Sequence, residues 1–203
     1  MDKLMLYLLI LLITNSFQYT TCVVTNNPTP LDFVKTSCKT TRHPALCVNS
    51  LSNYASSIQG NDQKLAKAAI AVSLKTAKSA SAYVSKLAGT SNIKPIESQA
   101  LKDCVSSMTS CVASLTQSAQ ELGKMAQFKG QNFVWHMDNV QTWVSSALTN
   151  QYNCIGGFSD RSMNGQLKDA VNKKMGSVSD VTSNALALVN RFAVRHKEAK
   201  NKP

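Results

Sequence analysis

Long stretches in which apolar residues recur with a helical period restrict the fold of this 203-residue chain more than any other feature. From Asp62 to Gly89, apolar residues recur every three or four positions, and the lysines of this segment mostly fall outside that stripe. The stripe consists of Leu65, Ala69, Val72, Thr76, Ala80, Tyr83 and Leu87. Asn61 can cap the start of the segment and Gly89 can close its end. The pattern predicts one long amphipathic helix.

Three further segments show the same period. One opens near Pro95 and continues to Leu122, a second covers about 133–149, and a third runs from about 163 to 195. In the segment 133–149, the residues expected to face inward are Phe133, Met137, Val140, Val144 and Ala147. No segment alternates with a period of two, so strands are not expected. We predict an all-α protein, an antiparallel four-helix bundle over residues 61–196 that is followed by a basic tail at 197–203.

A separate unit precedes the bundle at residues 30–58. Pro44 interrupts any continuous helix there, because a proline ring clashes with the preceding turn and lacks an N–H group. The unit is predicted to form an N-terminal helical hairpin of two short helices.

The first 22 residues have the pattern of a secretory signal peptide. A charged start is followed by the apolar run Leu4 to Ile13 and by small residues at Thr20 and Cys22. The alternative of an uncleaved anchor is disfavoured, because the apolar run is too short for a bilayer that requires about 20 residues. The mature protein is therefore expected to be soluble and secreted.

The net charge of +11 restricts the expected partners. Basic proteins favour nucleic acid, acidic membranes or acidic polysaccharide. Export makes nucleic acid the least expected of these.

Asn27 carries the only N-x-Ser/Thr pattern, and the proline that follows it rules out glycosylation there.

Two of the five cysteines that follow the signal peptide flank Pro44. Cys38 and Cys47 would lie about 13 Å apart in a straight helix, beyond the roughly 7 Å that a disulfide tolerates. The break at Pro44 lets them pair and close the hairpin. The chain-entropy treatment gives about 3 kcal/mol for so short a loop.

The other three cysteines allow two pairings. Cys104 and Cys111 share a helical face and cannot pair with each other unless the helix unwinds. One of them is therefore expected to pair with Cys154, and their spacing does not decide which. The remaining thiol is expected to be a small buried apolar group.

The residue types needed for catalysis or metal binding are scattered. His43, His136 and His196 lie far apart, metal-type Cys and His spacings are missing, and the carboxylates form no evident pair. We expect no enzymatic activity, no catalytic residue, no metal and no cofactor. A lipid carrier would need a cavity, and a membrane-active protein would need a broader exposed apolar face. Both alternatives are disfavoured, and no membrane partner is expected.

Four motifs in order resemble those of the plant invertase and pectin methylesterase inhibitor family. They are "SCKTTRHPALCVNSL" at 37–51, "ALKDCVSSM" at 100–108, "VQTWVSSALTNQYNC" at 140–154 with the following "GGF", and "VTSNALALVNRF" at 181–192. The resemblance implies a secreted four-helix bundle with a protruding hairpin. It also implies the disulfides Cys38–Cys47 and Cys104–Cys154, which leave Cys111 as the free thiol.

The same resemblance implies a function. It indicates a free-standing inhibitor of pectin methylesterase in the apoplast or cell wall, one that blocks the enzyme's active-site cleft without covalent chemistry. Inhibition of cell-wall or vacuolar acid invertase is the alternative. De-esterified pectin is a further expected partner, because it is a polyanion and the protein is basic.

The expected partner-binding residues lie on and after the third helix. Asp138, Thr142, Ser145 and Thr149 recur on its polar side. The resemblance implies that this side meets the enzyme, and that the disulfide through Cys154 holds Thr149, Asn150 and Asn153 in place. Methylesterase inhibitors usually carry threonine where this chain has Asn153, which changes the shape and the donors of that contact.

Overall fold

The computed structural model describes residues 28–163 and 165–200. The predicted signal peptide at 1–22 lies outside the described residues. Within those residues the protein is helical and contains no strand. The prediction of an all-α fold is confirmed. Among the residues described, no helix combines the length and apolar character needed to cross a bilayer.

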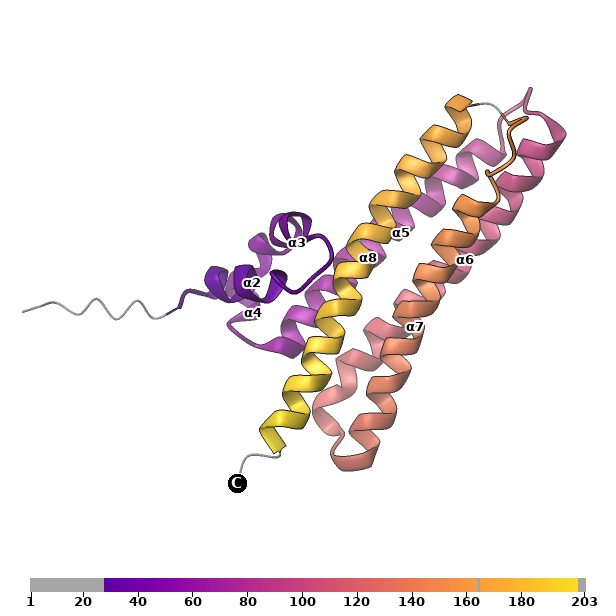
Figure 1. Ribbon diagram of the computed structural model, residues 1–203. Helices are drawn as coiled ribbons and strands as arrows, with labels where there is room; N and C mark the ends of the chain where they lie inside the picture. The colour runs from indigo at the N-terminus through magenta and orange to yellow at the C-terminus, as the bar shows by residue number, and fades with distance from the viewer. Residues whose placement is uncertain (1–27, 164, 201–203) are drawn as a thin grey trace, which may run out of the picture.

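Four long helices pack side by side as an up-and-down bundle (Figure 1). They are α5 (Asp62–Ala88), α6 (Pro95–Lys124), α7 (Gly130–Gly156) and α8 (Gly165–Lys200), with the short 3₁₀ turn η2 (Met125–Gln127) between α6 and α7. α5 and α7 lie diagonally, since each contacts α6 and α8. The helix α8 continues to Lys200 and so extends into the segment expected as a basic tail.

The helix starts follow local sequence rules. The Asn61 side chain accepts a hydrogen bond from the backbone N–H of Lys64 at 2.9 Å and caps α5. Gly60 precedes it with φ of +72°, which a glycine adopts without a Cβ clash and which lets the chain turn from the hairpin into the bundle. Pro95 occupies the first turn of α6. Backbone N–H groups in a first turn have no carbonyl partner within the helix, so a proline there removes no helical hydrogen bond.

The buried side of α7 is the predicted one. Phe133, Met137, Val140, Val144 and Ala147 are each at most 2% exposed.

The buried side of α5 is rotated relative to the prediction. Ser73, Ala77 and Val84 are fully buried, whereas Tyr83 is only half-buried, as are Val72, Thr76 and Leu87. Small residues face the bundle axis because they allow close approach, and the Tyr83 ring lies at the edge, 5.9 Å from the Lys174 ammonium.

The predicted end of the third helix near residue 149 is wrong. α7 continues through Cys154 to Gly156, and Gly157 caps it. Threonine, asparagine and tyrosine, which fill four of the five positions from 149 to 153, are weaker helix formers, so this segment resembles a helix end. Tertiary burial overrides that preference, because Gln151 and the following Phe158 are completely buried.

The hairpin projects from the side of the bundle and packs its inner face against α5 and α8 (Figure 1). It consists of α2 (Pro30–Cys38), α3 (Pro44–Leu51), the 3₁₀ turn η1 (Ser52–Tyr54) and α4 (Ala55–Ile58), so its second limb is divided rather than one helix. A disulfide joins Cys38 to Cys47, with Cα atoms 5.6 Å apart. The Asn184 amide of α8 holds the turn through two hydrogen bonds of 2.9 Å with the His43 backbone.

Candidate protein-binding surface

An exposed polar line follows the outer side of α7, and we name it the α7 strip. It comprises Asp138, Thr142, Ser145, Thr149 and Asn153, all exposed. At a rise of 1.5 Å per residue it spans about 22 Å. Asn150, the sixth residue expected at the partner contact, is half-buried and lies off this line. The structure therefore brings five of the six predicted residues onto one exposed line.

The side chains near the end of the α7 strip bond back to their own helix. The Thr149 hydroxyl donates to the Ser145 carbonyl at 3.3 Å, and the Asn150 amide donates to the Ser146 carbonyl at 3.0 Å. In these bonds the side-chain hydrogens point to the helix's own carbonyls, so they are not available to donate to a partner protein. Thr149 therefore presents an oxygen that accepts hydrogen bonds, on a short side chain that loses little conformational entropy on binding.

Two large aromatic side chains flank the α7 strip, and neither was predicted from the sequence as a binding residue. Trp135 is 60% exposed at one end, and Tyr152 is 53% exposed at the other. Their positions on the helical wheel, away from the buried stripe, were a signal that could have found them. Exposed aromatic side chains are frequent anchors in protein interfaces, because they bury much apolar area with few rotatable bonds.

Trp135 rests on an ordered cluster. The Trp135 and His136 rings form an edge-to-face contact with centroids 4.7 Å apart. The His136 ring also stacks on the Phe128 ring, with centroids 3.4 Å apart. The His136 Nδ1 atom also bonds to the Glu121 carboxylate on α6. The exposed Trp135 side chain is therefore supported by His136, and the bond from His136 to Glu121 links α7 to α6.

Hydrogen bonds on either side fix α7 against its neighbours. Ser146 and Ser114 of α6 are joined by a hydroxyl pair at 3.5 Å, and the Gln141 amide donates to Asn190 of α8 at 2.7 Å. A hollow of about 280 Å³ lies beside Asp138, between α7 and α8. The α7 strip is thus a ridge with a recess along one flank.

A disulfide joins Cys104 of α6 to Cys154 in the last turn of α7, with Cα atoms 4.2 Å apart. Both cysteines are buried, and Phe158 fills the core directly after the helix. The Phe158 N–H donates to the Ile155 carbonyl at 3.0 Å, which turns the chain inward. The end of the α7 strip is therefore anchored both covalently and by packing.

Cys111 is the free cysteine and is completely buried. The Gln151 amide donates to its sulfur at 3.3 Å and to the Thr182 hydroxyl at 3.1 Å, which joins three helices through one buried polar group. Burial raises the pKa of the Cys111 thiol. The thiol therefore stays neutral and shielded, which does not suit a nucleophile.

The histidines lie in three separate places. His43 pairs with Asp180 at 3.3 Å, His136 with Glu121, and His196 stacks on Phe133 at 3.6 Å. Within 28–163 and 165–200 there is no group of three or more His, Cys, Asp or Glu side chains that could hold a metal ion.

A disulfide-tied helical bundle with an exposed, immobilised helix face has the features of a protein that acts by binding another protein. The family described as "Plant invertase/pectin methylesterase inhibitor" matches residues 32–188. The chain belongs to this family.

Relatives of known name support the assignment. The chain is 43% identical to "Pectinesterase inhibitor 9" of Arabidopsis thaliana over 188 residues, which cover 91% of this chain and 92% of that one. It is 41% identical to the "21 kDa protein" of Daucus carota over 165 residues, 81% and 86% of the two chains. A crystal structure of a pectin methylesterase inhibitor from Arabidopsis, in a mutant form, has the same fold, with a TM-score of 0.61 and 18% identity over 77% of this chain and 95% of that one.

Proposed function

We propose that this protein inhibits pectin methylesterase by placing the α7 strip across the enzyme's substrate cleft. The observation that carries the proposal is the exposed, anchored α7 strip on a chain whose relatives bear the name pectinesterase inhibitor. The inhibitor is not an enzyme, and the complex is stoichiometric and non-covalent.

The geometry supports this mechanism through preorganisation. A helix held by neighbours on both flanks and by a disulfide at its end has little freedom left to lose when it binds. Short side chains along the α7 strip allow close approach, and Trp135 and Tyr152 add apolar area at its two ends. Binding free energy is then concentrated on a surface that needs no rearrangement.

A paired inhibition assay tests the proposal. Purified mature protein is added to plant pectin methylesterase and, separately, to acid invertase. We expect release of methanol from esterified pectin to fall in proportion to inhibitor added, up to one equivalent, while sucrose hydrolysis is unchanged. Full esterase activity at micromolar excess would contradict the proposal, and loss of sucrose hydrolysis would support the invertase alternative instead.

We place the protein outside the cell, in the apoplast or cell wall. The signal-peptide pattern at residues 1–22 supports this location, as does the substrate of the proposed target, which is a wall polysaccharide.

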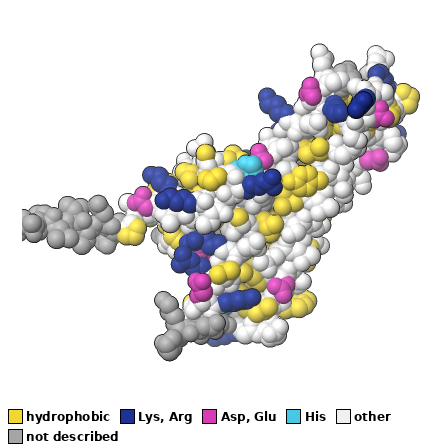
Figure 2. Space-filling model, in the orientation of Figure 1, with side chains coloured by type: hydrophobic (Ala, Val, Ile, Leu, Met, Phe, Trp, Pro, Cys, Tyr) yellow, Lys and Arg dark blue, Asp and Glu magenta, His cyan; other side chains and the backbone are white. Residues whose placement is uncertain are grey.

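A second candidate function is binding to de-esterified pectin. The net charge of +11 favours it, and Lys and Arg side chains lie over the hairpin and the adjoining bundle (Figure 2). We expect the protein to be retained on immobilised polygalacturonate and to elute earlier as ionic strength rises, because salt screens the attraction. Retention that does not change with salt would argue against electrostatic binding.

A further inference from the structure

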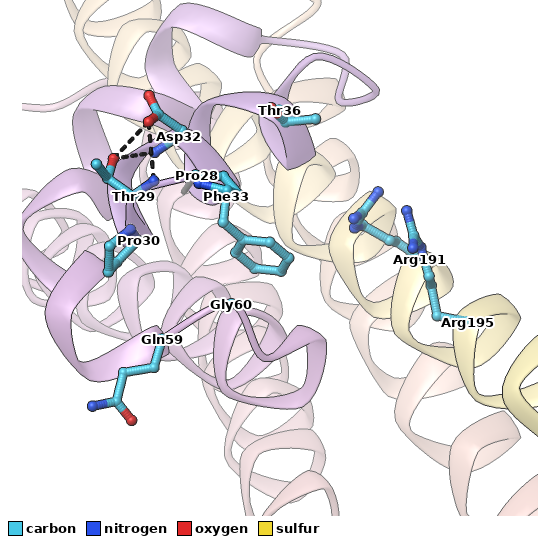
Figure 3. A pocket seen from close by; sticks show the side chains of 10 residues that line it. All are labelled: Pro28, Thr29, Pro30, Asp32, Phe33, Thr36, Gln59, Gly60, Arg191 and Arg195. Carbon is cyan, nitrogen blue, oxygen red and sulfur yellow. Dashed lines mark hydrogen bonds between the residues drawn. The ribbon is translucent and has the colours of Figure 1, made fainter. Parts of the chain in front are cut away.

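A groove separates the hairpin from α8. Its larger hollow has a volume of about 640 Å³, within the range of ligand sites. Phe33 and Thr36 of α2 and Gln59 line it on one side, and Arg191 and Arg195 of α8 line it on the other (Figure 3).

The two arginines stand in the middle of the groove rather than at its end. They are one helical turn apart, about 6 Å along the axis. Both also line a second hollow of about 590 Å³ that continues toward Thr40 and Glu198. Figure 3 shows both side chains leaving α8 in the direction of the hairpin. A ligand lying along the groove would cross both guanidinium groups.

The two arginines are held differently. The Arg191 Nε atom donates to the Asp62 carboxylate at 2.8 Å, the side chain is only 16% exposed, and its guanidinium carbon lies 5.8 Å from the centre of the Phe33 ring. Arg195 is exposed and has no acidic partner within 4 Å among the described residues. Arg191 is therefore a fixed part of the groove wall, and the charge of Arg195 is available to a ligand.

Carboxylates at the edges of the groove leave its centre basic. Asp32 accepts hydrogen bonds from the Thr29 hydroxyl and backbone N–H at 2.7 and 3.1 Å, and these bonds lower its pKa and keep it charged. Glu198 lines the far hollow. Because Asp62 already balances the charge of Arg191, an anionic ligand is directed to Arg195 and away from both ends of the groove.

The chemistry of the groove suits a sugar chain that carries carboxylates. A planar guanidinium binds a carboxylate through two parallel hydrogen bonds. The Phe33 ring offers an apolar surface for a sugar ring, and the Thr36 hydroxyl can bond to a sugar hydroxyl. We propose that this groove is a specific binding site for a short stretch of de-esterified pectin, with Arg195 as its principal carboxylate ligand.

This site rests on the proposed affinity for de-esterified pectin and adds a location to it. The groove lies between the hairpin and α8, whereas the α7 strip lies on the outer side of α7, which is diagonal to α5 in the bundle. The two surfaces are formed by different residues, so the protein can hold the wall polysaccharide between the hairpin and α8 while the α7 strip binds the esterase. Such an arrangement would retain the inhibitor where its target enzyme produces new carboxylates.

Binding of short oligogalacturonates to the mature chain, measured by calorimetry, tests the site. We expect Arg195→Glu to weaken binding at least tenfold, because it reverses the charge that meets the ligand. Thr36→Trp is expected to weaken it at least fivefold by filling the hollow without changing the charge. Lys173→Glu is the matched control, with the same charge change at an exposed position far along α8, and should alter binding less than twofold.

Equal losses in the Arg195→Glu and Lys173→Glu variants would overturn the site and leave only diffuse electrostatic attraction. Undiminished binding in both Arg195→Glu and Thr36→Trp, or no binding by the unmodified protein, would also overturn it. Fully methyl-esterified oligomers of equal length should not bind, because their carboxylates are blocked. Esterase inhibition measured in parallel should be unchanged by Arg195→Glu, so failure of the groove and failure of the α7 strip are distinguishable.

Discussion

Replacing Thr142 with arginine is expected to raise the inhibition constant for pectin methylesterase at least 100-fold. Thr142 lies within the α7 strip, between Asp138 and Ser145, where its short side chain allows the helix to approach the enzyme closely. A long charged side chain at that position would have to be desolvated or would hold the two surfaces apart. A 100-fold change corresponds to about 2.7 kcal/mol, the size of a central interface contact. Titration of esterase activity with the variant measures it.

The loss should not come from unfolding. Thr142 is exposed, and arginine is a better helix former than threonine, so the free energy of unfolding should stay the same or rise slightly. Ser85→Arg, at an exposed position of α5, adds the same charge and should inhibit normally. If Thr142→Arg inhibits as well as Ser85→Arg, the α7 strip is not the contact surface.

The long helices could be predicted because their pattern repeats many times. Over some thirty residues of α6, single exceptions do not obscure a period of 3.6. The rotation of the buried side of α5 could not be predicted in the same way, because serine and alanine give no clear hydrophobic signal. Whether Ser73 or Thr76 faces the bundle axis depends on how closely α5 packs against α6 and α8. The sequence of α5 alone does not indicate that distance.

The end of α7 and the groove beside α8 depend on tertiary structure. Gln151 is buried because Cys111 and Thr182 of two other helices receive its hydrogen bonds, and nothing near residue 151 in the sequence indicates this. Likewise, Phe33 and Arg195 are far apart in the chain and meet only when the hairpin folds onto α8. The polar residues of the α7 strip were predictable because they lie on one helix, where spacing alone defines a face.

Removing the disulfide between α6 and α7 with the pair Cys104→Ser and Cys154→Ser is expected to lower the free energy of unfolding by about 4 kcal/mol. The bond closes a loop with a sequence separation of 50, which restricts the unfolded chain strongly. The loss is a large part of the 5–15 kcal/mol that usually stabilises a domain. Urea unfolding, followed by circular dichroism, measures it.

The same pair should also release the end of the inhibitory surface. Four of the five residues at 149–153 are weaker helix formers that the disulfide holds in the helix, so the amides of this segment should exchange hydrogen faster and inhibition should weaken. The pair Cys38→Ser and Cys47→Ser is the matched control, because it removes the hairpin disulfide and costs about 3 kcal/mol but leaves α7 untouched. Faster exchange at 149–153 in both pairs would mean that global stability, rather than the local bond, orders this end of α7. Slow exchange there in the first pair would show that burial of Gln151 and Phe158 is sufficient to hold it.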